Sequence, residues 1–261
     1  NGFPDKIQPL FQAINLAEYV IFYVGSLDKF TGEQIIALDM LKRKNGIISH
    51  TYEVDETRLK AMIKGTVLEQ YKHASSPEIK QEINKLSPIS KEGKTKIVID
   101  HCFDVKGVGT VVLGKVTQGK VKQYANLKLF PNGADVMIKS IQMHDDPVEE
   151  AVSPARVGLS VKGVKVDEIS RGDYLCEDET QNVQTEIKLD FKQNPFYKGT
   201  ISENQMCLVS VGMQIKAGKF TSINPIVLQL DKPVVCDKND ICVILKPEST
   251  SVRILGSGLI H

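Results

Sequence analysis

The most informative segment of the sequence runs from Asp100 to Gly119 and reads Asp-His-Cys-Phe-Asp-Val-Lys-Gly-Val-Gly-Thr-Val-Val-Leu-Gly-Lys-Val-Thr-Gln-Gly. Apolar residues alternate on the approach to it from Lys94, and a valine-rich run resumes after Gly109. Such runs on both sides of a glycine pair predict a strand, a tight turn and a second strand. A Gly-x-Gly can also cradle a phosphate, but a phosphate loop needs Gly-Lys-Ser/Thr opening a helix. Because a β-branched strand follows instead, we interpret Gly107–Gly109 as a turn.

Composition indicates an ordinary globular protein. The length of 261 residues favours roughly two domains, or three small ones. Charged residues make up 25% and the net charge is +1, so any case for nucleic-acid binding must be local. The five cysteines show no Cys-x-x-Cys spacing and the histidines are dispersed, so we expect buried thiols in a reducing, cytoplasmic setting and no metal site. No apolar run reaches the 18 residues of a membrane span, so we expect no membrane partner.

Residues 1–87 alternate between the helical and the strand period. Helices are predicted over 4–16, over 31–41 with Thr31 as the cap, from 55, and from 76 to about 86. Strands are predicted over 19–24 (buried on both faces because the run is continuously apolar), 46–49 and 67–71. This is a parallel α/β pattern that amounts to half a domain.

The period changes from 3.6 to 2 after a polar linker at 87–94 that contains proline and glycine. Strands are then predicted over 95–105, 109–117, 126–129, 136–143, 156–161 and 174–176, and again over 183–191, 207–215, 219–230, 241–245 and 252–259. Short strands at this spacing suggest two closed barrels. The predicted domains are 1–87, 94–179 and 183–261.

The barrel residues resemble a known family. Lys106–Val116 with Gln118-Gly119 is similar to the second domain of translational GTPases such as elongation factor Tu, and 141–144, 156–159, 161–164 and 169–175 follow in that family's order and spacing. The tail Val252–Ile260 resembles the end of the third domain of archaeal selenocysteine-specific elongation factors (SelB). The resemblance covers 95–261 and implies a partial, GTPase-like α/β domain followed by two all-β barrels.

Residues 1–87 resemble the carboxyl half of the GTPase domain, with one departure. The family requires Asn-Lys-x-Asp after the strand at 46–49, because the aspartate reads the guanine ring, and this sequence has His50-Thr51-Tyr52-Glu53. The phosphate loop and the magnesium-holding aspartate are also missing from the sequence. From these departures we interpret the domain as a degenerate relative that does not hydrolyse GTP. We expect no cofactor, with GTP and Mg²⁺ only if a part upstream of Asn1 carries a phosphate loop.

Two positions of the first barrel correspond to places where the family holds the aminoacylated end of tRNA. Gln142-Met143-His144-Asp145 is similar to Glu-Met-His-Arg of elongation factor Tu, but Asp145 removes a cation beside a phosphate. The alternative is a plain strand end with His144 in an exposed turn. Arg156 matches an arginine that faces the anionic selenol in selenocysteine-specific factors, although the preceding acidic residue is Ala155 here. The alternative is an arginine that is solvated or ion-paired on the barrel surface.

Other candidates are lysines near the first barrel hairpin. We predict an RNA-facing surface made by Lys106, Lys115, Lys120 and Lys122, against the alternative of an ordinary solvent-exposed strand face. No catalytic pair is evident: His101 and Cys102 are neighbours in a strand and should point to opposite faces.

The leading hypothesis is an elongation-factor-like protein that binds tRNA, the ribosome or a translation-factor partner without turnover. One alternative is a GTPase whose phosphate-binding motifs lie upstream of the given sequence. The other is a protein-interaction scaffold that has lost RNA binding. We expect no DNA partner.

Overall fold

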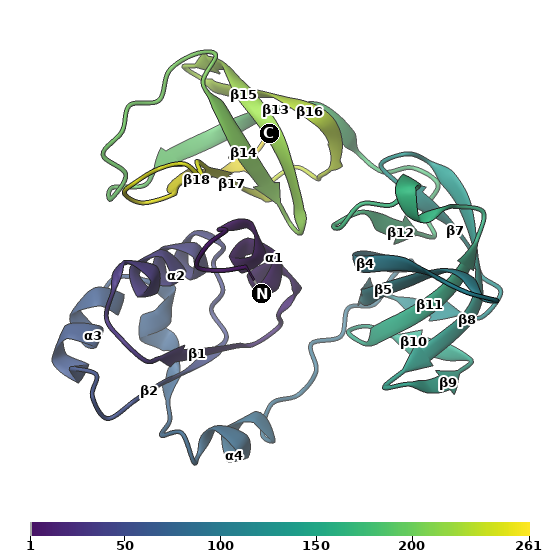
Figure 1. Cartoon of the computed structure of the whole chain (residues 1–261), viewed down its shortest axis with the longest axis horizontal. Coiled ribbons are helices and arrows are strands. Elements are labelled where there is room, and N and C mark those ends of the chain that lie inside the picture. The colour runs from purple at the N-terminus through teal and green to yellow at the C-terminus, as the bar shows by residue number, and fades with distance from the viewer. Residues whose placement is uncertain (1) are drawn as a thin grey trace.

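The computed structural model describes residues 2–261, which form three bodies in chain order (Figure 1). The first is an α/β body around a parallel sheet with the order β1 (Val20–Val24), β2 (Gly46–His50), β3 (Lys72–His73). Its helices are α1 (Gln8–Leu16), α2 (Lys29–Met40), α3 (Glu56–Ile63) and α4 (Ile79–Ile83), with a 3₁₀ helix η1 at Val67–Gln70.

Strand β1 is buried on one face only, so the prediction of burial on both faces was wrong. Phe22 and Val24 pack into the core, whereas Ile21 and Tyr23 are 46% and 52% exposed. The strand lies at the edge of the sheet, and α4 contacts β2. A continuously apolar sequence therefore does not here mean a strand in the middle of a sheet.

Two local predictions in the α/β body were also wrong. Asp28, not Thr31, caps α2: its Oδ1 accepts from the backbone N–H of Phe30 and of Thr31 at 2.8 and 2.9 Å. The predicted strand at 67–71 is η1, in which Thr66 caps the N-terminus and Val67 and Leu68 are buried. Burial of these apolar residues overrides their preference for a strand.

The first barrel closes with six strands. The ring order is β11 (Arg156–Lys162), β5 (Gly109–Gln118), β4 (Lys96–Val105), β12 (Tyr174–Cys176), β7 (Asn126–Phe130) and β8 (Ala134–Met143), closed by pairing of β8 with β11. The short strands β6 (Lys120–Lys122), β9 (Asp146–Val148) and β10 (Glu150–Val152) and the 3₁₀ helix η2 (Val166–Glu168) were not predicted. The turn at Gly107–Gly109 is confirmed, with φ of 83° and 93° at the two glycines.

The second barrel also has six strands. They are β13 (Val183–Gln193), β16 (Ile226–Val235), β15 (Gln214–Ile223), β14 (Met206–Val211), β17 (Ile241–Leu245) and β18 (Ile254–Ile260), in ring order. The predicted strands 207–215 and 219–230 each span two strands and a turn. The first turn escaped prediction because it contains Met213, which is apolar and only 3% exposed.

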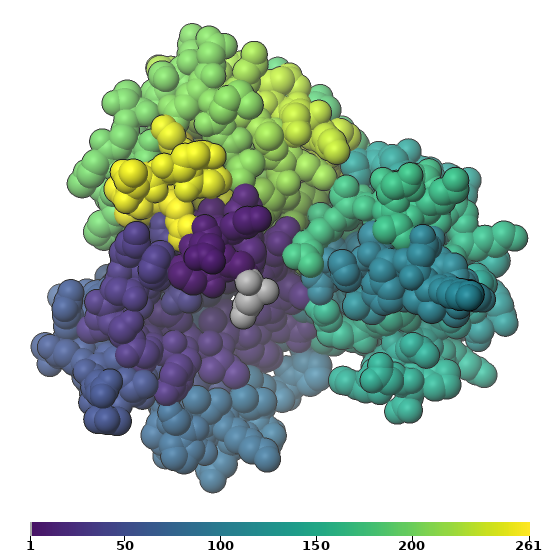
Figure 2. All heavy atoms as spheres, viewed as in Figure 1, coloured from purple at the N-terminus to yellow at the C-terminus, as the bar shows by residue number. Residues whose placement is uncertain are grey.

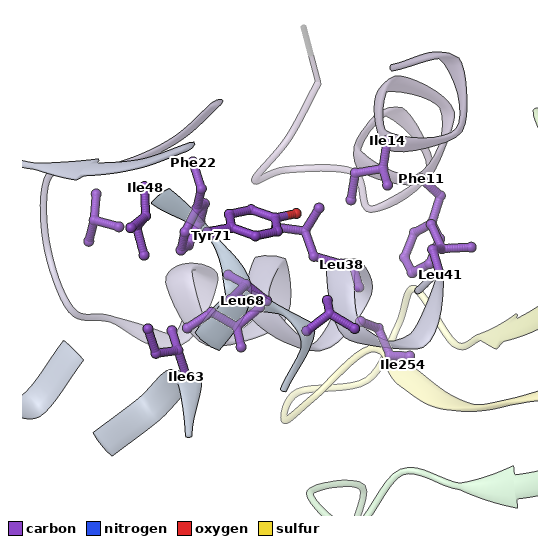
Figure 3. Packing of buried hydrophobic residues seen from close by; sticks show 14 of the residues in the cluster. Phe11, Ile14, Phe22, Leu38, Leu41, Ile48, Ile63, Leu68, Tyr71 and Ile254 are labelled. Carbon is purple, nitrogen blue, oxygen red and sulfur yellow. The ribbon is translucent and has the colours of Figure 1, made fainter. Parts of the chain in front are cut away.

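The α/β body shares its hydrophobic core with the second barrel. Val243, Leu245 and Ile254 belong to the cluster that contains Phe11 and Leu38. Figure 3 shows Ile254 reaching the side of this cluster near Leu41, and in Figure 2 the C-terminal segment lies against the N-terminal one. This interface is therefore an extension of a domain core.

The buried ion pair of Arg253 and Glu33 seals that interface. The two residues are 8% and 4% exposed. The guanidinium donates from Nη2 to Glu33 Oε2 at 2.5 Å and from Nη1 to the Pro4 carbonyl at 2.7 Å. Further donation from the Arg253 backbone N–H to Glu33 Oε1 at 3.0 Å satisfies the carboxylate twice over.

Helix α1 contacts both barrels. Asn15 donates to the Gly212 carbonyl of the second barrel at 2.7 Å. On the other side, Lys115 of β5 donates to the Leu16 carbonyl at 3.0 Å and pairs with Glu18 at 2.6 Å. The barrels themselves meet through a small cluster of Phe130, Tyr174, Cys176 and Val235. Across residues 2–261, none of the helices has the length and apolar character needed to cross a bilayer.

Candidate nucleic-acid interface

The predicted stretch Gln142-Met143-His144 ends β8 and enters a two-residue hairpin turn. His144 and Asp145 both have positive φ, 52° and 70°, between paired Met143 and Asp146. Two successive residues of this conformation match the right-handed twist of a hairpin. Gln142 and His144 are exposed, whereas Met143 is partly buried against the barrel core. The turn therefore exposes polar residues at its tip, and Met143 anchors it to the barrel core.

Arg156 begins β11 and is ion-paired. Its Nη2 lies 2.8 Å from Asp100 Oδ2, and its side chain is 49% exposed. Asp100 also accepts at its backbone carbonyl from Arg171 Nε at 2.6 Å, and Arg171 Nη1 donates to Gln12 of α1 at 3.2 Å. The geometry therefore matches the alternative in which Arg156 is ion-paired on the barrel surface. That surface adjoins the α/β body.

Asp100 was missed by the sequence reasoning, and the structure explains why. The register of β4 against β5 shifts between Ile99 and His101, so Asp100 is the extra residue of a β-bulge. A bulge re-aims a side chain out of the regular alternation. Nothing local in the sequence marks that position, because the bulge is defined by the pairing partner.

The structure brings the two predicted positions together. Gln142 pairs with Gly158 across β8 and β11, so Arg156 and the hairpin turn lie at the same end of two adjacent strands. Together with Asp100 and Arg171 they form a polar surface, which we call the β8–β11 end.

The four predicted lysines do not gather into one patch. Lys106 lies in the exposed turn between β4 and β5, while Lys120 and Lys122 lie beyond the far end of the ten-residue β5. At about 3.4 Å per residue, these positions are on the order of 30 Å apart. Lys120 and Lys122 each lie 3.9 Å from Glu150 Oε2. The side chain of Lys115 is only 12% exposed, so it faces the α/β body and not solvent.

Cys102 is positioned as a structural thiol. Its Sγ donates to the carbonyls of Val166 and Ile169 at 3.7 and 3.8 Å, and burial raises its pKa. His101 is exposed on the opposite face, as the strand alternation predicted. A thiol with a raised pKa is a poor nucleophile.

The loop after β2, His50–Glu53, occupies the place of the family's guanine-reading motif. His50 Nδ1 lies 2.8 Å from the Thr51 carbonyl, and its Nε2 lies 3.6 Å from Glu56. Tyr52 is 93% exposed and Glu53 is exposed. These residues supply no amide and aspartate pair for the edge of the base, so the loop does not fit the family's guanine site.

Comparisons with known proteins agree with the fold. The family model for elongation factor Tu domain 2 matches residues 109–176. An uncharacterized protein of Methanocaldococcus jannaschii, MJ0325, is 35% identical over 98% of this chain and 84% of its own length. The selenocysteine-specific elongation factor of the same organism is 30% identical over 70% of this chain, but only 43% of its length is covered.

A solved structure shares the whole architecture. Translation elongation factor SelB from Methanococcus maripaludis, in complex with the GTP analogue GPPNHP, superposes with a TM-score of 0.83 at 23% identity, over 98% of this chain and 68% of that one. The chain belongs to the translational GTPase-like family related to SelB. The predicted fold class, an α/β region followed by two barrels, is confirmed.

Proposed function

We propose that this chain is an elongation-factor-like binding protein that engages tRNA or the translation machinery through its barrels and does not hydrolyse GTP with its described residues. The observation that carries the proposal is the contrast between its parts. The two barrels have the fold of the SelB structure, whereas the loop His50–Glu53 has none of the asparagine and aspartate side chains with which the family reads guanine.

The β8–β11 end is the surface that we assign to the RNA or its aminoacyl group. It combines the guanidinium of Arg156, half exposed, with the exposed Gln142 and His144 on a fixed turn. A guanidinium suits phosphate or another anionic group by paired donation. Asp100 and Asp145 reduce the net positive charge of this surface. Binding should therefore depend more on where individual donor groups lie than on the overall charge.

The test is binding of the chain to aminoacylated and deacylated tRNA at two salt concentrations, with and without GTP. We expect a preference for the aminoacylated form, affinity that falls with salt by about 0.7 log units per log unit for each phosphate contact to the single-stranded end, and no effect of GTP. Arg156→Ala should remove the preference. Lys162→Ala, an exposed cation at the other end of β11, is the matched control and should keep it.

Two results would contradict the proposal. A GTP-dependent affinity would mean that the chain reads guanine nucleotide by other residues. Absence of tRNA binding at both salt concentrations would leave the protein-interaction scaffold as the better reading.

A further inference from the structure

A cationic cleft lies where the linker, α1, the end of α2 and the first barrel meet. It has a volume of about 430 Å³, and five of its lining side chains are cations: Lys42, Arg43, Lys44, Lys91 and Lys115. The one carboxylate in the lining is Glu18, which is already paired with Lys115. The cleft therefore carries an excess of positive charge that its own residues do not neutralise.

Arg43 is the central cation of this cleft. Its Nη2 donates to Asn15 Oδ1 at 2.8 Å, its Nε is buried without a partner, and no carboxylate of residues 2–261 lies within ion-pairing distance. Burial lowers the pKa of the guanidinium, and the Coulombic effect of Tyr71 opposes this shift only in part. Holding a partly buried cation without a counter-charge costs free energy, so binding of an anion beside it would be favourable.

The backbone fixes the other cations in place. Lys42 has a positive φ of 52° at the end of α2, and the N–H of Arg43 donates to the Leu38 carbonyl at 3.0 Å. In the linker, the Lys91 N–H donates to Ser153 Oγ at 3.2 Å and its carbonyl accepts from Gly119 at 2.8 Å. The segments that carry Lys44 and Lys91 are therefore held by separate bodies of the molecule, on two sides of one cleft.

A purely structural role explains only part of this arrangement. Cations at the end of a helix are stabilised by its dipole, and Lys42 lies 3.6 Å from Asp39. That account covers Lys42 and Lys44, but it does not explain why the partly buried Arg43 has no carboxylate partner, or why Lys91 comes to the cleft from the linker. A neighbouring cleft of about 470 Å³ shares Arg43 and Lys91 but is lined also by Asp237 and Asp240. That neighbouring cleft has three cations, with Lys96, against two carboxylates, so the cleft next to Lys44, with five cations against one, is the more positive of the two.

We propose that this cleft binds phosphate groups, supplied either by a free nucleotide or pyrophosphate or by an RNA backbone. Ammonium and guanidinium groups converging on one space are the usual ligands of phosphate oxygens. The volume is within the range of small-ligand sites. The proposal does not depend on tRNA binding at the β8–β11 end, which uses different residues.

The test is titration calorimetry of the full chain with inorganic pyrophosphate, and anisotropy with a fluorescent single-stranded RNA 12-mer, both at low salt. The double variant Lys44→Glu/Lys91→Glu changes two exposed side chains. We expect it to lose about tenfold in affinity for each lysine. The matched control Lys188→Glu/Lys219→Glu makes the same charge change at exposed positions of the second barrel and should change affinity less than threefold.

The outcomes separate the sources of phosphate. If the wild-type chain binds pyrophosphate and the cleft variant does not, the result supports a small phosphate ligand. If the wild-type chain binds RNA, the cleft variant does not, and pyrophosphate displaces the RNA, the result supports an RNA backbone as the ligand. The proposal fails if neither probe binds, or if the control variant loses as much affinity as the cleft variant. Arg156→Ala should leave pyrophosphate binding intact, so failure here is distinguishable from failure of the tRNA proposal.

Discussion

At the scale of single residues, Arg253 has the largest predicted effect on stability. Arg253→Ala leaves Glu33 ionised in an environment where it is 4% exposed, so we expect a loss of about 3–5 kcal/mol in the free energy of unfolding. The double variant Arg253→Met/Glu33→Gln removes both charges and should cost less than Arg253→Ala alone. Urea denaturation followed by circular dichroism measures both.

An exposed ion pair provides the control. Lys128→Ala breaks a pair with Asp135, whose side chain is 88% exposed, and should cost less than about 1 kcal/mol. If Arg253→Ala costs no more than Lys128→Ala, the buried pair is not what joins the α/β body to the second barrel.

Asp173 gives a prediction with a pH dependence. It is 4% exposed, its Oδ1 has no hydrogen-bond partner among the described residues, and burial raises its pKa. For a carboxyl whose pKa is higher in the folded state, the ionised form opposes folding above that pKa, and the penalty disappears as pH falls below the unfolded-state pKa.

We therefore expect Asp173→Asn to raise the thermal midpoint at pH 8 and to have progressively less effect as the pH approaches 4. Oδ1 of the new amide can still accept the Ser170 N–H bond, which is 2.8 Å long in the protein. Thermal melts of both proteins across this pH range measure the difference. A gain independent of pH would show that the charge of Asp173 is not the cause.

At the scale of elements, two glycines with positive φ differ in their surroundings. One has only the backbone conformation to constrain it, and the other also lies close to a neighbouring segment. Gly107 in the β4–β5 turn has φ of 83° and open space around its Cα, whereas at Gly119, with φ of 66°, an added Cβ would lie 2.3 Å from the Gly93 carbonyl oxygen. We expect Gly107→Ala to cost about 1 kcal/mol from strain alone, and Gly119→Ala about 3 kcal/mol because the linker must also move.

Urea midpoints of the two alanine variants test this pair. If both variants lose the same free energy of unfolding, the linker can move away at residue 93 without cost, and its contact with the barrel does not stabilise the fold.

Sequence patterns predicted the barrel elements well and the α/β elements less well. All six ring strands of the first barrel were predicted, because each is a short apolar run bounded by turn residues. In the second barrel, one error came from the turn that contains Met213, which is apolar and buried. The other error missed the turn at Asn224-Pro225, although both residues are typical of turns, because the apolar runs on either side of it were joined into one strand. The cap at Asp28 was missed because Asp28 and Thr31, three positions apart, can both cap a helix, and the sequence does not show which of them does so.

At the scale of the whole molecule, the two interfaces of the α/β body differ in kind. The second barrel joins it through a shared apolar core, while the first barrel joins it through polar contacts, chiefly Lys115 with Glu18 and the Leu16 carbonyl. We therefore expect the first barrel to separate from the α/β body more easily than the second.

Lys115→Ala should make this difference visible. Removing the ammonium leaves Glu18 without its partner, so we expect protease cleavage in the 87–94 linker to rise about tenfold and the radius of gyration from X-ray scattering to increase. Lys122→Ala, an exposed lysine of the same barrel, is the control and should change neither. An unchanged cleavage rate in Lys115→Ala would mean that other contacts hold the first barrel.

The class of the fold follows from local sequence, since glycine turns and period-two alternation specify strands and hairpins wherever the chain lies. The sequence also shows that the guanine-reading residues are replaced by His50-Thr51-Tyr52-Glu53. Which charges meet depends on the folded chain: the bulge turns Asp100 toward Arg156, Lys115 and the pair of Arg253 with Glu33 are buried, and Lys44 and Lys91 line one cleft. Each of these depends on strand register or on packing between segments far apart in the chain, and no local pattern encodes such distances.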